Sequence, residues 1–428
     1  MASEASLGGR IPILGIGASA GGIEALQTLF AAMPGDLGVA FVVLIHLDPS
    51  HDSELPSILA HATAMPVTQV NAPTAIRANC VYVIPPNRRL LITDDLITPA
   101  EFKEPRGHRA PIDQFFRSLA EQHGDGFAMV LSGGGSDGSL GVRAIRENGG
   151  IILVQDPDEA EFGSMPRNAI ASGADFVLPV RELAQCLANL ARSKPVVAQQ
   201  TLETGDEETL RRILAHLRAR VGQDFSGYKR ATLLRRIARR MQVAQTARLE
   251  TYLAYLREHP EEVGALFNDL LISVTSFFRD ASAFSTLARE VIPLLFPPQG
   301  RDPAIRVWVP ACATGEEAYS IAILLLEEAA RREARPDIQI FATDLDDQAL
   351  AVARDGRYPA AIATDVSEER LRRFFAREGE QYRIRREVRD LVVFASHSVL
   401  KDPPFSHINL ISCRNMLIYL DRDLQQQV

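Results

Sequence analysis

The 428-residue chain has little cysteine. Its four cysteines, Cys80, Cys186, Cys312 and Cys413, lie far apart and form no CxxC pair. This spacing excludes a disulfide scaffold and a cysteine zinc site, and it is typical of proteins from a reducing compartment. We therefore expect a cytoplasmic protein without a metal site.

Long apolar runs are also missing. No stretch reaches the roughly 18 apolar residues that a membrane span needs, and the N-terminus lacks the charged-then-apolar pattern of a secretory signal. The chain has no excess of positive charge either, since its formal net charge is −8. That balance argues against general nucleic-acid binding. We expect no membrane insertion and no nucleic-acid partner.

The sequence pattern predicts two α/β units. A length of 428 residues corresponds to two to four domains of roughly 100–200 residues. Apolar runs alternate with helix-like segments over 1–192, a linker is expected over 193–205, and 206–289 is purely helical. Strands return over 290–428, and such alternation favours parallel sheets. The candidate strands are Ile11–Leu14, Ala40–Ile45, Val81–Ile84, Ala128–Leu131, Ile151–Val154 and Phe176–Leu178, then Ile305–Val309, Ile338–Ala342, Leu391–Phe394 and Asn409–Ile411.

A glycine-rich motif, Gly15-Ile16-Gly17-Ala18-Ser19-Ala20-Gly21-Gly22, follows the first candidate strand. A helix-like segment over 23–33 comes next, so a strand is expected to end in a tight glycine turn with the serine at its apex. Two chemistries use such a turn. The N–H groups of the helix N-terminus can hold a phosphate, or the serine can be a nucleophile whose oxyanion those N–H groups stabilise.

A histidine and an aspartate favour the second chemistry. His46 ends the second candidate strand, and Asp137 lies in the glycine-rich loop after the fourth. Loops at the carboxyl ends of parallel strands share one crevice, so Ser19, His46 and Asp137 can converge into a nucleophile, a base and an orienting carboxylate. Taken singly, the histidine could be a satisfied strand-end residue and the aspartate a turn residue.

A dinucleotide site is the competing interpretation. Gly15-x-Gly17-x-x-Ala20 formally matches the dinucleotide fingerprint, with Asp48 as the acidic residue. Asp48 lies farther along the chain than the roughly 20 residues usual for the ribose-binding acid. The fingerprint also gives no role to Ser19 or His46, so a nicotinamide oxidoreductase ranks last.

The motifs of the first unit resemble those of the chemotaxis protein-glutamate methylesterases of the CheB type. The resemblance covers about 10–190 and includes Val83–Arg88, Ser132–Gly138 and Met165–Ala169. It implies hydrolysis of glutamyl methyl esters through an acyl-enzyme, a chemistry that extends to deamidation of glutamine. It also implies roles for single residues: Ser19 as nucleophile, His46 as base and acid, Asp137 as its partner, and the N–H of Gly134 in the oxyanion hole.

A basic helix is expected next. Seven basic residues and no acid lie over 229–248, and apolar residues recur at helical spacing among them. Arg235, Arg236 and Arg239 are expected on a positive face that binds an acidic substrate surface, where charge assists association. The alternative is a solvated helix face paired with acids elsewhere in the fold.

A second crevice is expected after the strand Ile305–Val309. A turn of small residues follows this strand and leads into a helix that begins near Glu316. The next strand ends at Asp344, where a carboxylate can accept hydrogen bonds from ribose hydroxyls. Because no phosphate-binding lysine motif is present, a cofactor without a polyphosphate fits better.

With the motifs Thr275–Arg279 and Cys413–Tyr419, this region resembles the chemotaxis receptor methyltransferases of the CheR type from about 206 to 428. The resemblance implies a Rossmann-like domain with S-adenosylmethionine (SAM) as cofactor, a small β-subdomain over about 358–389, and methyl-accepting chemotaxis-type receptors as partners. It leaves open whether Glu316 or Glu317 makes the main contact. The implied SAM contacts are Thr275, Arg279, Glu316, Asp344, Arg414 and Asn415, with Tyr419 near the transferred methyl group.

The sequence thus predicts a bifunctional methylesterase–methyltransferase. Methyltransferases of this class need a seven-stranded sheet, and only four candidate strands begin at or after Ile305. We therefore expect the transferase domain to be incomplete at Val428, which puts its activity in doubt. The alternative from another class is a non-catalytic signalling scaffold that binds receptors or SAM.

Overall fold

The computed structural model describes residues 10–46, 53–102, 109–124, 126–203, 207–271, 275–296 and 304–428. The chain forms two compact units. The first comprises the residues up to Leu210 together with Arg235–Glu258, and the second comprises Arg211–Leu234 and His259–Val428. The helical segment predicted over 206–289 is thus divided between the units, with one cut inside helix α8 (Arg230–Val243).

The first unit is built on a parallel sheet with seven strands among its described residues, in the order β10-β9-β8-β1-β2-β5-β3. From β1 the chain winds outward through β2 in one direction and through β8 in the other. The switch point of the sheet therefore lies between β1 and β8, where α/β proteins place their sites. The strands are β1 (Ile13–Ala18), β2 (Ala40–Ile45), β3 (Val67–Gln69), β5 (Val81–Val83), β8 (Phe127–Val130), β9 (Ile151–Gln155) and β10 (Phe176–Leu178).

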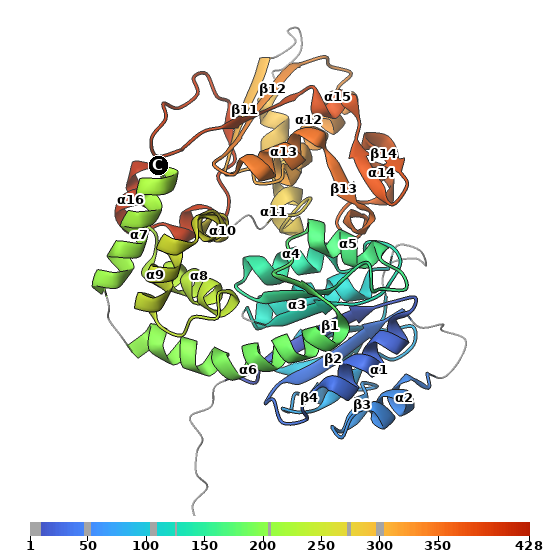
Figure 1. Cartoon of the computed structure of the whole chain (residues 1–428). Helices are drawn as coiled ribbons and strands as arrows, with labels where there is room; N and C mark the ends of the chain where they lie inside the picture. Colours follow the sequence, from blue (N-terminus) through green and yellow to red (C-terminus); the bar gives the residue numbers. More distant parts are fainter. Residues whose placement is uncertain are drawn as a thin grey trace, which may run out of the picture. The chain divides into compact units, whose positions relative to one another are not determined.

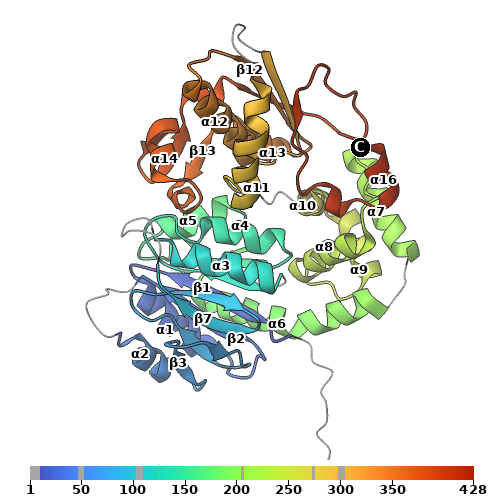
Figure 2. The same ribbon diagram turned by 180° about the vertical axis from the view of Figure 1, so that it is seen from behind.

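Helices cover both faces of this sheet, as Figures 1 and 2 show from opposite sides. One face carries α1 (Gly22–Ala32) and α6 (Val180–Glu203), with α2 (Leu55–Ala62) beside α1; the other carries α3 (Pro111–Gln122), α4 (Ser139–Glu147) and α5 (Ser164–Ala171). Because both faces are covered, the central strands are buried throughout, and β2 and β8 are continuous apolar runs. A small antiparallel sheet adds β4 (Thr74–Ala75), β6 (Arg89–Thr93) and β7 (Leu96–Ala100).

The first strand differs from its predicted bounds. It continues through the glycine motif to Ala18, so Gly15 and Gly17 lie inside β1 rather than in a turn. A Cβ atom on Gly17 would lie 2.6 Å from Cγ2 of Ile112, and one on Gly15 would lie 2.7 Å from Cε1 of Phe116. These glycines therefore allow α3 to approach the strand. The turn itself depends on Gly21, whose φ of 70° is left-handed.

The segment expected to be a linker, 193–205, is helical through Glu203 as the end of α6. After Pro195 it contains Ala198, Gln199, Gln200, Leu202 and Glu203, which are residue types that favour helices. The helix therefore continues past the composition change that suggested a linker.

The second unit contains a parallel sheet with four strands among its described residues, in the order β16-β12-β11-β17. Its switch point lies between β11 and β17 by the same reasoning. A separate antiparallel sheet in the order β13-β15-β14 lies where the β-subdomain is predicted. The strands are β11 (Ala304–Pro310), β12 (Asp337–Asp344), β13 (Arg357–Pro359), β14 (Phe375–Glu378), β15 (Gln381–Ile384), β16 (Val392–Ser396) and β17 (Leu410–Ile411).

The remaining helices lie after Glu203. Helix α9 (Leu249–Glu258) and the larger part of α8 belong to the first unit. In the described chain, no helix is both long and apolar enough to cross a bilayer. The others are α7 (Glu207–Val221), α10 (Pro260–Leu270), α11 (Ala281–Thr286), α12 (Glu316–Arg331), α13 (Asp347–Asp355), α14 (Glu368–Phe374), α15 (Arg386–Arg389) and α16 (Arg422–Gln427), with short 3₁₀ or π turns at Leu287–Val291, Ile292–Leu295, Ala360–Thr364 and Leu417–Tyr419.

Candidate active sites

Ser19 and His46 follow neighbouring strands of the first unit. Ala18, the last residue of β1, pairs with Ile45, the last residue of β2, so Ser19 and His46 are the next residues at the same sheet edge. The half-buried Ser19 donates its N–H to the carbonyl of Ser132 at 3.0 Å. The turn with the serine is therefore attached to the loop that follows β8, across the switch point.

His46 and Asp137 form a direct pair. The Nε2 atom of His46 lies 2.9 Å from Oδ2 of Asp137. Asp137 also accepts the backbone N–H groups of Ile112 at 3.1 Å and Asp113 at 2.9 Å. Its side chain is 8% exposed, whereas that of His46 is 43% exposed. The carboxylate is thus fixed by the N-terminus of α3, and the imidazole that it orients faces solvent.

The contact with Asp137 raises the pKa of His46 above its ordinary value. The hydrogen bond to the Asp137 carboxylate is the largest cause, and the negative charge of the same group adds to it. Partial burial of the ring acts in the opposite direction. A carboxylate that stabilises the imidazolium is the feature that makes a histidine an effective general base for a hydroxyl.

The glycine loop after β8 is held by hydrogen bonds to α5 and to the residue Phe162 before it. Gly133 donates its N–H to the carbonyl of Phe162 at 2.9 Å, and Gly135 donates to Oγ of Ser164 at 3.0 Å. Gly134, between them, is exposed. A Cβ atom on Gly133 would lie 3.0 Å from Cβ of Ser19. The same Cβ atom would lie 2.7 Å from Cε of Met165, so the loop lies against both the candidate nucleophile and α5.

The geometry does not favour a dinucleotide site. In that fingerprint the glycines form the turn that holds the pyrophosphate. Here Gly15 and Gly17 lie inside β1 and contact α3. The proposed ribose-binding acid, Asp48, lies outside the described residues.

The predicted positive face of the basic helix is not formed by Arg236 and Arg239. Both residues are 2% exposed. The Nη2 atom of Arg239 donates to Oδ1 and Oδ2 of Asp175 at 2.7 and 2.6 Å, and its Nε donates to the carbonyl of Gly150 at 2.8 Å. All of these residues belong to the first unit. Of the alternative, the pairing with an acid elsewhere in the fold is found for Arg239, but the residue is buried and not on a solvated face.

Arg236 is buried for a related reason. It donates to the carbonyl groups of Arg146 and Glu147 at the end of α4. The last carbonyls of a helix lack partners within the helix and carry partial negative charge, so a guanidinium stabilises them. Of the three arginines assigned to the substrate-binding face, Arg235 alone is exposed. Two of the three arginines expected to bind acidic substrates therefore make contacts within the first unit instead.

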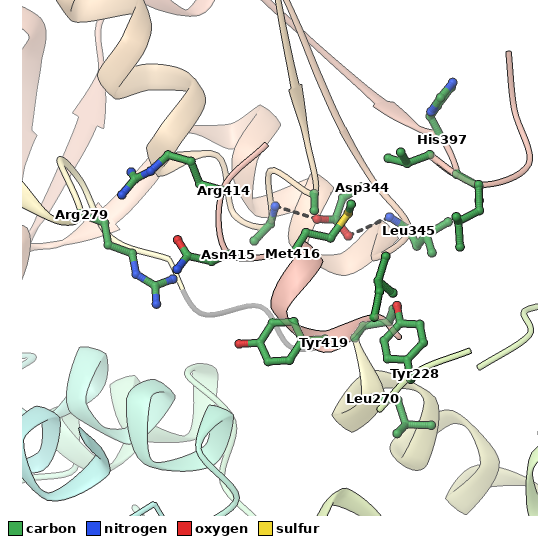
Figure 3. A pocket seen from close by; sticks show the side chains of 17 residues that line it. Tyr228, Leu270, Arg279, Asp344, Leu345, His397, Arg414, Asn415, Met416 and Tyr419 are labelled. Atoms are coloured by element: carbon green, nitrogen blue, oxygen red, sulfur yellow. Dashed lines mark hydrogen bonds between the residues drawn. The ribbon is translucent and has the colours of Figure 1, made fainter. Parts of the chain in front are cut away.

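The second unit contains a pocket at the carboxyl ends of its parallel strands (Figure 3). Residues that follow each strand line it: Ala311 and Ala313 after β11, Leu345 after β12, a segment at 397–400 after β16, and one at 414–416 after β17. Five residues predicted to bind cofactor or substrate are brought together in its wall. They are Arg279, Asp344, Arg414, Asn415 and Tyr419.

Asp344 is held in place by backbone donors. Its Oδ2 accepts the N–H of Ala313 at 2.7 Å, and its Oδ1 accepts those of Leu345 at 2.7 Å and Asp346 at 3.0 Å. Burial raises the pKa of this carboxyl, and the three N–H groups oppose that shift. A carboxylate has about four acceptor positions, so one remains for a ligand hydroxyl.

Three further residues predicted to bind the cofactor, or left open for that role, lie outside the pocket lining. Thr275, Glu316 and Glu317 do not appear among the described residues that line the pocket. Glu316 accepts the hydroxyl of Thr314 at 2.7 Å, whereas Glu317 accepts that of Ser412 at 2.6 Å and lies 3.7 Å from Arg414. Burial raises the pKa of Glu317. Both glutamates therefore contact residues of the loops around the pocket.

Sequence reasoning did not identify Tyr228 or His397, although both line the pocket (Figure 3). Burial raises the pKa of Tyr228 to about 12, so its hydroxyl stays protonated. Tyr228 precedes the basic helix and carries no strand-end signal. His397 directly follows β16, so the strand-end rule that identified Asp344 would also have found it. Its ring packs against Trp308 at 5.6 Å between centroids.

The folds and sites define the class of each unit. A doubly wound sheet with serine, histidine and aspartate at its switch point is typical of a serine hydrolase. A pocket across the strand ends, with an acidic residue after the second strand, is typical of a Rossmann-like nucleotide or SAM site.

Family comparisons agree with this division. The CheB methylesterase model matches residues 14–187. The all-alpha domain model of CheR methyltransferase matches 208–271, and the SAM-binding domain model of CheR methyltransferase matches 273–428. With the relatives described next, these matches show that the chain belongs to the CheB methylesterase family in its first part and to the CheR methyltransferase family in its second.

Relatives cover one or both parts. A 104.1 kDa protein of Rhodobacter capsulatus is 37% identical over 87% of this chain, which spans 42% of that relative's length. A putative protein-glutamate methylesterase/protein-glutamine glutaminase of Leptospira interrogans is 35% identical over 41% of this chain and 92% of its own length. The chemotaxis protein methyltransferase of Salmonella typhimurium is 31% identical over 51% of this chain and 75% of its own length. The crystal structure of the Thermotoga maritima CheB methylesterase catalytic domain aligns at 23% identity over 42% of this chain and all of that domain, with a TM-score of 0.40.

Proposed function

We propose that the chain hydrolyses methyl esters of receptor glutamates in its first unit and methylates such glutamates in its second. The observation that carries the esterase half is the 2.9 Å pair of His46 and Asp137 beside the Ser19 turn at the switch point. The substrates are methyl-accepting chemotaxis-type receptors. The alternation of ester formation and hydrolysis would set their methylation level.

In the esterase half, the hydroxyl of Ser19 attacks the carbonyl carbon of the methyl ester. His46 takes the hydroxyl proton and passes it to the departing methanol, while Asp137 stabilises the imidazolium. The N–H of Gly134 donates to the oxyanion. Water then hydrolyses the acyl-enzyme with His46 as base. A glutamine side chain reaches the same acyl-enzyme with loss of ammonia, an activity that the Leptospira relative's name also includes.

Methanol release from a methyl-esterified receptor fragment tests this proposal. His46 must be neutral to accept the proton, and its pKa is raised above 6.5. We therefore expect kcat/KM to increase with pH and to level off only above pH 6.5. The Asp36→Asn variant, altered at an exposed position away from the site, serves as the control and should follow the same profile. An absence of release from the folded chain, or a rate independent of pH, would contradict the proposal.

In the transferase half, the residues around the pocket fit SAM. Arg279 and Arg414 supply positive charge for a carboxylate, Asp344 offers an acceptor for a hydroxyl, and Met416 and Leu420 add apolar surface. When bound, SAM would supply a methyl group activated on a sulfonium. A glutamate carboxylate is already nucleophilic, so the task of Tyr419 and its neighbours is to bind and orient.

Replacement of Asp344 by alanine is expected to weaken SAM binding by about 10-fold to 100-fold, because a hydrogen bond to a charged group contributes roughly 1.5–3 kcal/mol. Isothermal titration of the full chain measures the dissociation constant directly. Asp347→Ala is a matched control, since Asp347 is exposed three residues away in α13. Equal SAM affinities for the wild type and Asp344→Ala would show that Asp344 does not contact SAM.

A further inference from the structure

A second carboxyl group lies behind Asp137. Asp113, in the first turn of α3, is 1% exposed. Its Oδ1 accepts the N–H of Gly141 in α4 at 2.6 Å, and its own backbone N–H donates to Oδ1 of Asp137 at 2.9 Å. Two aspartates therefore share the contact between α3 and the loop that carries Asp137. The esterase mechanism gives no role to the Asp113 side chain.

The surroundings of Asp113 are apolar and tightly packed. Ile112, Phe116 and Val142 are fully buried there. A Cβ atom on Gly141 would lie 2.4 Å from Cβ of Phe116, which shows how closely α3 and α4 approach. In such a place two neighbouring carboxyl groups are not both ionised, because each charge is poorly solvated and they repel each other.

The hydrogen bonds decide which carboxyl group carries the charge. Asp137 accepts three donors, from His46 and from the backbones of Ile112 and Asp113. Asp113 accepts the N–H of Gly141 on Oδ1, whereas its Oδ2 is buried without a hydrogen-bond partner in the described structure. Donors stabilise the ionised form, so the negative charge belongs on Asp137 and a proton on Asp113.

We propose that Asp113 is a positioning residue of the esterase site that acts as a neutral carboxylic acid, so that Asp137 is the single negative charge facing His46. The inference rests on the proposed esterase function. Ionisation of Asp113 would add a second negative charge behind Asp137. That charge would hold a proton on His46 and oppose the oxyanion that develops at the ester, so hydrolysis would slow.

The electrostatics of the cluster agree with this assignment. Burial and then the charge of Asp137 raise the pKa of Asp113 to about 8, although Arg117 in α3 and the N–H groups of Gly141 and Gly138 act in the opposite direction. Asp137 comes from the loop before α4, and His46 faces it from the end of β2. Asp113 is therefore neutral at pH 7 and loses its proton as the pH rises past about 8.

The test compares Asp113→Asn with the wild type over pH 6 to 9.5 in the methanol-release assay. Asparagine keeps an acceptor oxygen for Gly141 and cannot ionise. We expect kcat/KM of the wild type to fall above pH 8 and that of Asp113→Asn to stay level, which makes the variant about tenfold faster at pH 9. Asp113→Leu removes the acceptor and should lower kcat at every pH. The surface control Asp36→Asn should follow the wild type.

Two results would overturn the proposal. One is the same alkaline decline in Asp113→Asn as in the wild type. The other is a loss of more than tenfold in Asp113→Asn at pH 7, which would mean that the charge of Asp113 is needed. A wild-type chain without any methanol release would instead overturn the proposed esterase function on which the inference rests.

Stability gives a readout that does not depend on activity. Because the pKa of Asp113 is raised in the folded state, its contribution to stability is complete below its unfolded pKa near 3.8 and is lost as the pH rises towards about 8. The thermal midpoint of Asp113→Asn should therefore increase relative to the wild type between pH 5 and pH 9. A constant difference over this range would show that Asp113 is already ionised at pH 5, contrary to the proposal.

Discussion

Replacement of Ser19 by alanine is expected to lower kcat for methanol release by at least ~10³-fold. Removal of the nucleophile from a serine triad leaves only the catalysis that binding and the oxyanion hole provide. Ser19 begins the turn after β1, and its backbone N–H, rather than its side chain, donates to the carbonyl of Ser132. The substitution should therefore leave the fold unchanged and remove the reacting oxygen alone.

Two controls make this result specific. Ser57→Ala changes an exposed serine of α2 and should keep the wild-type rate. SAM affinity of Ser19→Ala should also match the wild type, because the pocket that we propose for SAM belongs to the second unit. A Ser19→Ala variant that still releases methanol within tenfold of the wild-type rate would exclude Ser19 as the nucleophile.

Replacement of Arg239 by alanine is expected to destabilise the packing of α8 within the first unit by about 3 kcal/mol. The Arg239 side chain is 0% exposed and the Asp175 side chain 4% exposed, so loss of the cation leaves a buried carboxylate without its charge partner. Asp175 also accepts the N–H of Ile152 at 2.9 Å. Hydrogen exchange measured by mass spectrometry should therefore accelerate by roughly 100-fold in peptides of β9 and α8.

Arg235→Ala is the matched control for this prediction. Arg235 lies on the same helix but is exposed, so its loss should change the stability by less than about 0.5 kcal/mol. A double-mutant cycle with Asp175→Asn then isolates the coupling between the two charges. Equal exchange in Arg239→Ala and Arg235→Ala would contradict the structural role assigned to the buried pair.

The sequence predicted both a central strand that is buried throughout, Ala40–Ile45, and an edge strand that is only partly buried, Phe176–Leu178. Ala40–Ile45 and Phe176–Leu178 have their predicted bounds, because a short apolar run between polar turns is a clear strand signal. The predicted bounds of the first strand were wrong because Gly15 and Gly17 interrupt its apolar pattern. Those glycines are required by the approach of α3, a contact between segments about 100 residues apart that local pattern reasoning does not contain.

The sites show the same limit. His46 and Asp137 could be predicted as candidates because each lies in a segment that follows a strand, and their side chains lie 2.9 Å apart. The burial of Arg239 could not, because Asp175 and the carbonyl of Gly150 come from distant parts of the chain. The role proposed for Asp113 could not be predicted either, since the environment of its side chain arises from the packing of α3 on α4.

The central claim is that Ser19 is a nucleophile activated by His46, and labelling of the full chain with a fluorophosphonate tests it most directly. This reagent phosphonylates activated serines whatever the natural substrate, and peptide mapping locates the label. The account predicts modification of the peptide that contains Ser19, its absence in Ser19→Ala, and a strong reduction in His46→Ala. A folded chain that stays unlabelled at Ser19, or labels equally well without His46, would contradict the account.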